Sequence, residues 1–419
     1  MISKDGRFIA FESLAGDLLP GASFPSGQRN VFLYDVVNDS VKLVSGTSPS
    51  VPADGATELG WGQVLSADGR YLVMTTKASS LGGLPLPAGG SHVVLYDRTL
   101  DAYTLVSGPA PSGLPNADLP SLDGAGRFIV FRRSDPASLG TTSAGFVFDR
   151  QSGIAARFSD PSVRVFDVQI SANGSTIAFT SPGATPADAQ VFVLDRRTGR
   201  RTLASHGALV EEPGNGVSSL AGLDGNGDLI LFASSSTNLG VDLGFTSGGP
   251  RDPACCSPPH FAAFAFTVPP IAYTVSPACA STTGGRTVTI EGAHFRPGST
   301  VTLDGIPATV TNVTSTAITV VTGARAPTSA RTGNVEVRSP DGEYYALGNA
   351  FTYAVRGDAN NSGALTAADG FYLNLALFLG GPQPASLCNG DANGSGATTS
   401  ADAFFLNLYL FLGGAPPPP

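Results

Sequence analysis

The stretch SADGRYLVMTT, from Ser66 to Thr76, decides the fold of most of this chain. Its Asp-Gly turn leads directly into an apolar run, which is the pattern of a tight turn entering a buried strand. Because related stretches recur along the chain, we predict that one β-rich structural unit is built several times. The related stretches are SKDGRFIAFES at Ser3, DGAGRFIVFRR at Asp123, SANGSTIAFTS at Ser171 and DGNGDLILFAS at Asp224.

A second unit follows the first in four of the repeats and predicts a hairpin. It contains a strand, an Asp-led turn and another strand that ends in serine. The copies are YDVVNDSVKLVS at Tyr34, YDRTLDAYTLVS at Tyr96, FDRQSGIAARFS at Phe148 and LDRRTGRRTLAS at Leu194. They lie 62, 52 and 46 residues apart (96−34, 148−96 and 194−148). Four short strands in this length correspond to one blade of a β-propeller.

The two units together resemble the TolB-like or PD40 class of WD40-related propellers. The resemblance covers residues 1–267. Five blades can be counted from the repeats, whereas the family more often closes with six or more. Because the chain begins at the first unit, we expect N-terminal blades to be missing. Arg7, Arg70 and Arg127 recur at one repeat position, which favours a scaffolding role. Trp61 is the only tryptophan. We interpret it as a core or blade-interface residue, with stacking on a sugar as the alternative.

Residues 268–354 follow a Pro269–Pro270 linker and alternate in hydrophobicity along several short strands. This pattern predicts an immunoglobulin-like β-sandwich. The segment, with GGRTVTIEGAHF at its start, resembles the IPT/TIG domain. That resemblance implies a spacer or a protein-interaction module in a secreted protein.

The last segment, residues 355–419, contains one loop motif twice. GDANNSGALTAAD begins at Gly357 and GDANGSGATTSAD begins at Gly390, so the loops are 358–369 and 391–402. Oxygen side chains at positions 1, 3, 5, 9 and 12, with glycine at position 6, are the spacing of an EF-hand-type calcium loop. We therefore predict two calcium ions. The predicted ligands are Asp358, Asn360, Ser362, Ala364, Thr366 and Asp369, then Asp391, Asn393, Ser395, Ala397, Thr399 and Asp402, the alanines acting through their backbone carbonyls.

Each loop is followed by an apolar helix, FYLNLALFLGG from Phe371 and FFLNLYLFLGG from Phe404. Two such loop–helix repeats resemble the dockerin module. The resemblance implies two antiparallel helices that bind a cohesin domain in either of two orientations. Serine at position 5, where the family usually has aspartate, implies weak affinity, about 10⁻⁴ to 10⁻³ M. Two alternatives remain: plain Asp/Asn/Gly turns, or a calcium-stabilised stalk that binds no cohesin.

The four cysteines, Cys255, Cys256, Cys279 and Cys388, allow three full pairings. The sequence has no CxxC motif and its four histidines are scattered, which argues against zinc. In an oxidising compartment we expect a bridge from Cys255 or Cys256 to Cys279.

Composition and motifs limit the function further. A net charge of −9 without a basic run argues against nucleic-acid binding. No apolar run is long enough for a membrane span. We find no GxSxG, HExxH, Walker or dinucleotide motif. Although no signal peptide opens the chain, the calcium loops lead us to expect an extracellular or cell-surface protein.

We therefore predict a mainly β, non-catalytic binding or scaffold protein. Its propeller would present a face for an unknown ligand, and its dockerin-like tail would attach it to a cohesin-type partner or a cell surface. The alternative is a component of an extracellular polysaccharide-degrading glycoside hydrolase system. Its active site would lie in the propeller or in N-terminal sequence outside this chain, since two carboxylates need only meet in space.

Overall fold

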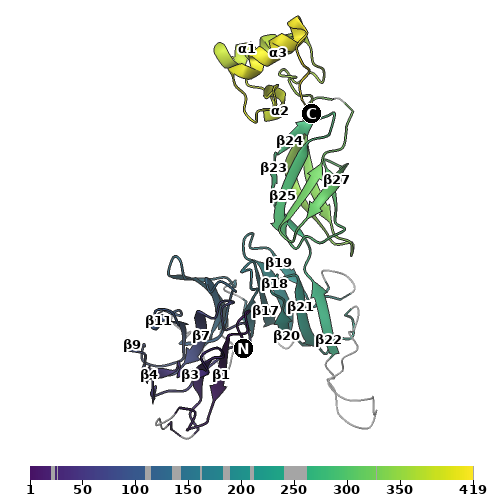
Figure 1. The fold of residues 1–419 in the computed structure, drawn as a ribbon. Helices are drawn as coiled ribbons and strands as arrows, with labels where there is room; N and C mark the ends of the chain where they lie inside the picture. Colours follow the sequence, from purple (N-terminus) through teal and green to yellow (C-terminus); the bar gives the residue numbers. More distant parts are fainter. Residues whose placement is uncertain are drawn as a thin grey trace. The chain divides into compact units, whose positions relative to one another are not determined.

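The computed structural model describes residues 1–419 except 20–23, 26, 109–114, 135–142, 161–162, 183–188, 208–211, 240–261, 327 and 419. The chain forms two compact units, Met1–Val268 and Pro269–Pro419 (Figure 1). It is mainly β, as the sequence predicts. No helix among the described residues has both the length and the apolar character needed to cross a membrane.

The first unit contains five successive antiparallel sheets that follow the sequence repeats. The first is β1 (Phe8–Ser13), β2 (Asn30–Asp35) and β3 (Ser40–Leu43); the second is β6 (Thr57–Glu58), β7 (Tyr71–Thr76), β10 (His92–Asp97) and β11 (Ala102–Leu105). The third is β12 (Asn116–Leu122), β13 (Phe128–Ser134), β14 (Ser143–Asp149) and β15 (Ile154–Arg157). The fourth is β16 (Val168–Ile170), β17 (Thr176–Pro182), β18 (Ala189–Asp195) and β19 (Arg201–Leu203); the fifth is β20 (Ser218–Leu223), β21 (Leu229–Ser234) and β22 (Ala262–Thr267). Two small hairpins are β4 (Gly46–Ser48) with β5 (Val51–Pro52), and β8 (Ser80–Leu81) with β9 (Leu84–Pro85).

The repeated turn has a clear physical basis. In the second sheet, Asp68 accepts hydrogen bonds from the Ser66 hydroxyl (2.6 Å) and the Arg70 backbone N–H (3.0 Å). Gly69 adopts φ +66° and packs against the ring of Phe8, so a side chain would be strained and would collide. The turn delivers the chain into β7, whose apolar residues are buried.

The scaffolding role of the repeated arginines is confirmed. Each pairs with the aspartate that opens the second unit of its own repeat: Arg7 with Asp35 (3.1 Å), Arg70 with Asp97 (2.8 Å) and Arg127 with Asp149 (3.1 Å). This ion pair ties the first unit to the second in the first three sheets.

A different arginine joins the second, third and fourth sheets each to the sheet before it. The guanidinium of Arg98 lies 3.9 Å from the ring centroid of Phe8, and that of Arg150 lies 4.2 Å from the ring of Tyr71. Arg196 repeats this contact on Phe128 at 3.6 Å. Each of these arginines also donates from Nε to the carbonyl of a glycine in the repeated turn, Gly69, Gly126 or Gly174. The YDR motif therefore carries inter-sheet contacts, which the sequence interpretation missed.

The second unit begins with a β-sandwich built from alternating strands. Its strands follow the order β23-β25-β28-β27-β26-β29-β30-β24. In β29, Val335 and Val337 are buried while Glu336 and Arg338 are exposed, as a half-buried strand requires. The strands are β23 (Ile271–Ser276), β24 (Cys279–Ser281), β25 (Thr287–Ala293), β26 (Thr300–Leu303), β27 (Ile306–Val313), β28 (Ala317–Val321), β29 (Arg331–Arg338) and β30 (Tyr344–Ala354).

Three helices complete this unit: α1 (Ala367–Phe378), α2 (Leu387–Gly390) and α3 (Ser400–Leu412). The two long helices begin four residues before the predicted starts at Phe371 and Phe404. The reason is a Thr-x-x-Asp capping box at each start, with Thr366 and Thr399 as the N-cap residues. The helices pack on each other through Leu373 and Leu406, which are fully buried. The short α2 was not predicted.

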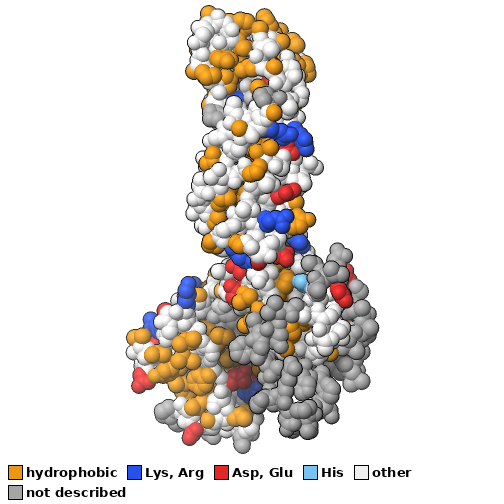
Figure 2. Space-filling view, turned by 90° about the vertical axis from the view of Figure 1, so that its right-hand side faces the viewer, with side chains coloured by type: hydrophobic (Ala, Val, Ile, Leu, Met, Phe, Trp, Pro, Cys, Tyr) orange, Lys and Arg blue, Asp and Glu red, His pale blue; other side chains and the backbone are white. Residues whose placement is uncertain are grey.

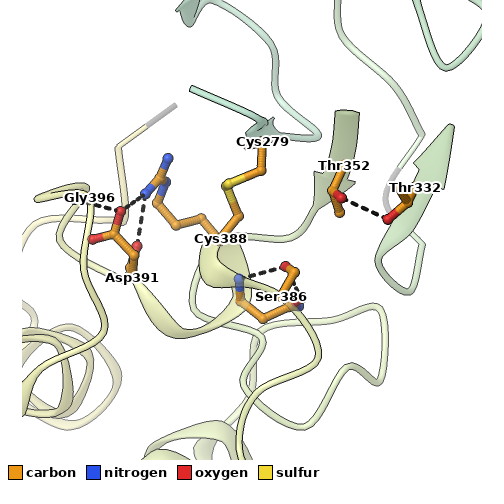
Figure 3. The surroundings of a disulfide bond; sticks show 9 residues. Cys279, Thr332, Thr352, Ser386, Cys388, Asp391 and Gly396 are labelled. Atoms are coloured by element: carbon orange, nitrogen blue, oxygen red, sulfur yellow. Dashed lines mark hydrogen bonds and ion pairs between the residues drawn. A yellow bond between two sulfur atoms is a disulfide. The ribbon is translucent and has the colours of Figure 1, made fainter. Parts of the chain in front are cut away.

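The predicted cysteine pairing is wrong. Cys279 of β24 is bonded to Cys388 of α2, 109 residues later in the chain (Figure 3). Cys255 and Cys256 lie outside the described residues. Because the chain returns from the two-loop segment to the sandwich edge, a distant cysteine becomes the partner. The predicted domains 268–354 and 355–419 thus lie in one compact unit, joined covalently.

Candidate functional site

The two predicted loops fold around their first and last aspartates. In the first loop, Asp358 accepts hydrogen bonds from the backbone N–H groups of Ser362 (2.8 Å) and Gly363 (2.7 Å). Asp369 accepts from the N–H groups of Asn360 (3.1 Å) and Thr366 (2.8 Å). The chain therefore wraps around both carboxylates within a span of twelve residues.

The second loop repeats this pattern. Asp391 accepts from the N–H of Gly396 (3.0 Å), and Asp402 accepts from the N–H groups of Asn393 (3.0 Å) and Thr399 (2.8 Å). The glycine at position 6 has φ +87° in the first loop and +94° in the second, a region that disfavours other residues. The same local chemistry thus produces the same backbone twice.

The remaining predicted ligands lie in the same two loops. The amide oxygens of Asn360 and Asn393 accept from the N–H two residues later, each at 2.9 Å. The hydroxyls of Ser362 and Ser395 donate to the carbonyls of Ala364 (3.1 Å) and Ala397 (3.3 Å). The threonine hydroxyls at position 9 donate to the aspartate at position 12. The six predicted ligands of each loop therefore lie together in that loop.

The four loop aspartates are buried, with exposed fractions of at most 1%. Burial raises the pKa of Asp358 above its ordinary value, and the nearby Asp369 carboxylate raises it further. Two buried carboxylates beside each other are costly unless a cation lies between them.

The donor set fits a hard cation. It consists of carboxylate, amide, hydroxyl and carbonyl oxygens, which suit calcium. In the part of the chain that the structure describes, no three His, Cys, Asp or Glu side chains group together as a metal site. Each loop accordingly has two carboxylates and depends on neutral oxygens for its other ligands.

The two loops hold each other through equivalent residues. Arg356 and Asn389 each lie two residues before a loop aspartate. Asn389 donates to the carbonyl of Asp358 (2.8 Å), and Arg356 donates to the carbonyl of Asp391 (2.8 Å). Arg356 also pairs with the Asp391 carboxylate at 3.0 Å (Figure 3). Among the described residues, Asp391 is the one loop aspartate that pairs with a cation.

This arginine makes the loops electrostatically unequal. The first loop has two carboxylates, whereas the second has two carboxylates and one guanidinium, a difference of one positive charge. Arg356 is 2% exposed, and its Nε and Nη2 have no hydrogen-bond partner within the described residues. A buried, partly unsatisfied cation opposes a second cation nearby. The sequence signal, an arginine where the other repeat has asparagine, was present but not recognised.

We expect Arg356→Asn to strengthen calcium binding at the second loop about tenfold, which is about 1.4 kcal/mol, because it removes a competing charge. Asparagine is the residue that this chain itself uses at the equivalent position, Asn389. Calcium titration calorimetry on the full chain measures both sites. Arg356→Lys is the control and should keep the sites unequal; equal affinities in the unsubstituted protein would contradict the prediction.

The two long helices carry an apolar surface that faces solvent. We call it the apolar helix face and define it by three residue pairs, each pair 33 positions apart. The exposed fractions are 69% and 71% for Phe371 and Phe404, 59% and 52% for Phe378 and Phe411, and 77% for both Leu379 and Leu412. The rings of Phe371 and Phe411 lie 6.1 Å apart, so the surface continues across both helices. Figure 2 shows hydrophobic side chains gathered over this end of the second unit.

The interpretation of Trp61 as a core or blade-interface residue is wrong. Its side chain is 88% exposed, on the loop between β6 and β7. The sequence could not show this, because its neighbours Leu59 and Val64 form an apolar pattern typical of a buried segment.

Comparison with known families identifies the sandwich. An IPT/TIG domain family model matches residues 270–353. This agrees with the resemblance found in the sequence, and the observed eight-stranded arrangement is an IPT/TIG-type immunoglobulin-like domain. No protein with a curated description matches the chain.

Several solved structures have partly similar folds. TolB from Acinetobacter baumannii is 16% identical with a TM-score of 0.34, covering 57% of this chain and 51% of its own, so the match spans about half of that protein. A putative TolB from Agrobacterium tumefaciens is 14% identical with a TM-score of 0.34, covering 84% of this chain and 88% of its own. An oligogalacturonate lyase in complex with manganese is 10% identical with a TM-score of 0.39, and the match covers 83% of this chain and 75% of the lyase chain. At TM-scores this low the likenesses carry no argument about function.

Proposed function

We propose that this chain is a secreted, modular, non-catalytic binding protein whose C-terminal segment is a dockerin-like, calcium-dependent docking module. The observation that carries the proposal is the repetition of one loop geometry at 358–369 and 391–402, each loop leading into a helix of the apolar helix face. Two calcium ions would be held by the twelve loop oxygens, and they would supply the positive charge that the buried carboxylates need.

The helices depend on the loops for their position. Asp369 and Asp402 cap the first turns of α1 and α3 and also belong to the predicted ligand sets. An ion that orders a loop would therefore orient the helix after it. The apolar helix face would then be presented in one arrangement, and a partner would bury its phenylalanines and leucines.

Two further observations support the assignment. A disulfide between Cys279 and Cys388 suits a protein of an oxidising compartment such as the cell exterior. The apolar helix face repeats at a spacing of 33 residues, which matches a partner that can bind in two orientations. A cohesin-type domain is the partner that the dockerin resemblance implies.

The proposal is tested with the full chain and a set of recombinant cohesin domains, by surface plasmon resonance with calcium and then with EGTA. We expect calcium-dependent binding to at least one cohesin. Phe371→Ala with Phe404→Ala should weaken it about 100-fold, because two exposed aromatic anchors are removed.

Either substitution alone should weaken cohesin binding much less, because the other orientation remains available. Tyr344→Ala, which removes a 57% exposed aromatic side chain from β30, is the matched control and should bind normally. The absence of binding to every cohesin in calcium, with both ions bound, would leave the calcium-stabilised stalk as the function of this module.

A further inference from the structure

The exposed Trp61 lies on a closely held loop. A side chain at Gly60 would collide with the carbonyl of Pro120, and one at Gly62 would collide with the side chain of Ser121. The Leu59 backbone N–H donates to the Glu12 carboxylate, and the Leu122 N–H donates to the Gln63 carbonyl at 2.7 Å. The loop is thus packed on both sides while the indole faces solvent. A fixed, exposed tryptophan is typical of a binding surface.

The repeats place this loop where several sheets meet. Trp61 lies five residues before Ser66, and Asp118, Phe166 and Ser219 lie five residues before Asp123, Ser171 and Asp224. These positions share a sequence offset, but in the strand ladders the counterpart of Asp118, opposite Arg132, is Glu58, opposite Thr75. Trp61 therefore lies in a longer loop of its own repeat. The strands that follow or contain them, β12, β16 and β20, lie against the neighbouring sheets. Because Gly60 and Gly62 abut Pro120 and Ser121, the Trp61 loop lies beside the part of β12 that contains Asp118.

Arg132 of β13 links two of these positions. Its guanidinium donates to both Asp118 oxygens (2.8 and 2.9 Å) and to the backbone carbonyl of Phe166 (2.9 Å). The partner strand β12 has an irregularity between Asp118 and Ser121, and Leu119 adopts φ 51°. Such irregularities redirect side chains and are common beside functional sites. Asp118 and Arg132 remain about a quarter exposed, at 24% and 25%.

The chemistry of this surface favours hydroxyl groups over acids. Arg132 has already committed donors to Asp118 and Phe166, whereas the Asp118 carboxylate keeps lone pairs for further donors. Asp167 adds a second carboxyl group that interacts electrostatically with Arg132 and Asp118. An apolar ring beside hydrogen-bond acceptors matches a sugar, which has a C–H face and a rim of hydroxyl donors.

We propose that Trp61, Asp118 and Arg132 form a binding site for a neutral polysaccharide. The indole stacks on the C–H face of one sugar ring, and the Asp118 carboxylate accepts hydrogen bonds from its hydroxyls. Arg132 is a positioning residue that holds Asp118 in place. This site belongs to the first unit and is independent of the calcium loops.

The single tryptophan makes the test direct, because the intrinsic tryptophan fluorescence of the full chain comes from Trp61 alone. The probes are hydroxyethylcellulose, xyloglucan, glucomannan and galactomannan, with polygalacturonate as the acidic comparator. At least one neutral polymer should shift the emission to shorter wavelength and protect Trp61 from acrylamide quenching. Polygalacturonate should do neither.

Affinity electrophoresis then compares variants. Trp61→Ala should weaken binding of the active polymer about 30-fold, which is about 2 kcal/mol, and Trp61→Phe should retain part of it. Because Trp61 is 88% exposed, its removal should leave the unfolding temperature unchanged. Leu100→Ala, which removes a 69% exposed side chain from the turn between β10 and β11, is the matched control.

Three results would overturn the proposal: no neutral polymer alters the tryptophan emission, Trp61→Ala binds as tightly as the parent, or polygalacturonate binds in a Trp61-dependent way. An Asp118→Asn variant separates the two parts of the site. It should weaken binding of the neutral polymer while leaving the acrylamide accessibility of free Trp61 unchanged.

Discussion

Calcium titration of the full chain should give two bound ions, and Asp369→Asn with Asp402→Asn should abolish both. Each aspartate is one of only two carboxylates in its loop, so its loss should lower the affinity of that site at least about 100-fold. Isothermal titration calorimetry measures the number of ions, and circular dichroism follows the helices. The full chain is used because Cys388 joins the loops to the sandwich.

The position-12 aspartates are the better choice for this test. Replacing Asp391 would leave the buried Arg356 without its ion pair and would destabilise the protein for another reason. Asparagine keeps the size of the side chain and an oxygen that can still accept from the N-cap residue.

Each single variant should lose one ion, and Asp341→Asn, at an exposed position of the sandwich outside both loops, should retain both. Calcium should also stabilise the unsubstituted protein, by about 2.7 kcal/mol per site when its concentration is 100 times Kd. No binding at millimolar calcium would mean that the loops are ordinary turns.

Removing the Cys279–Cys388 bridge should destabilise the second unit by about 3–5 kcal/mol. The bridge closes a loop across 109 residues, and crosslinks of that length restrict the unfolded chain strongly. Urea unfolding of Cys279→Ser with Cys388→Ser should show this loss, and the same loss should follow reduction of the parent protein. Both cysteines are almost fully buried. The free thiols of the reduced protein would therefore gain no contacts with water that offset the loss of the bridge.

Two controls define the bridge. Reductant should have no effect on the unfolding of the second unit in the double variant. Cys255→Ser with Cys256→Ser should keep the bridge and its stability, and peptide mapping should recover Cys279 linked to Cys388. Recovery of Cys279 linked to Cys255 or Cys256 in the parent would restore the pairing expected from the sequence and contradict the structure.

The features that the sequence specifies locally are those that need few neighbours. The loop at 358–369 is specified by its own twelve residues, because aspartates at positions 1 and 12 accept from N–H groups inside the same loop. The repeated Asp-Gly turns likewise depend on residues within five positions. Strand alternation and the IPT/TIG pattern follow from period-two burial, which is also local.

Even the local prediction was incomplete at the helix starts. The apolar run from Phe371 suggested where α1 begins, but the capping box at Thr366 and Asp369 adds its first turn. The same aspartate was assigned to the metal alone. A residue with two roles in one segment is easily assigned only one of them.

What the tertiary structure alone decided are contacts between distant residues. Cys279 meets Cys388, Arg356 reaches Asp391, and Trp61 is exposed while Arg132 joins Asp118 to Phe166. The local pattern around Trp61 does not distinguish a buried from an exposed position, and the cysteine spacing does not distinguish one partner from another. By itself, the amino-acid sequence determined the repeating strands, the sandwich and the oxygen spacing of the loops. Short-range hydrogen bonds and side-chain periodicity depend only on residues a few positions apart. The pairing of groups far apart in the chain depends on how the folded segments pack.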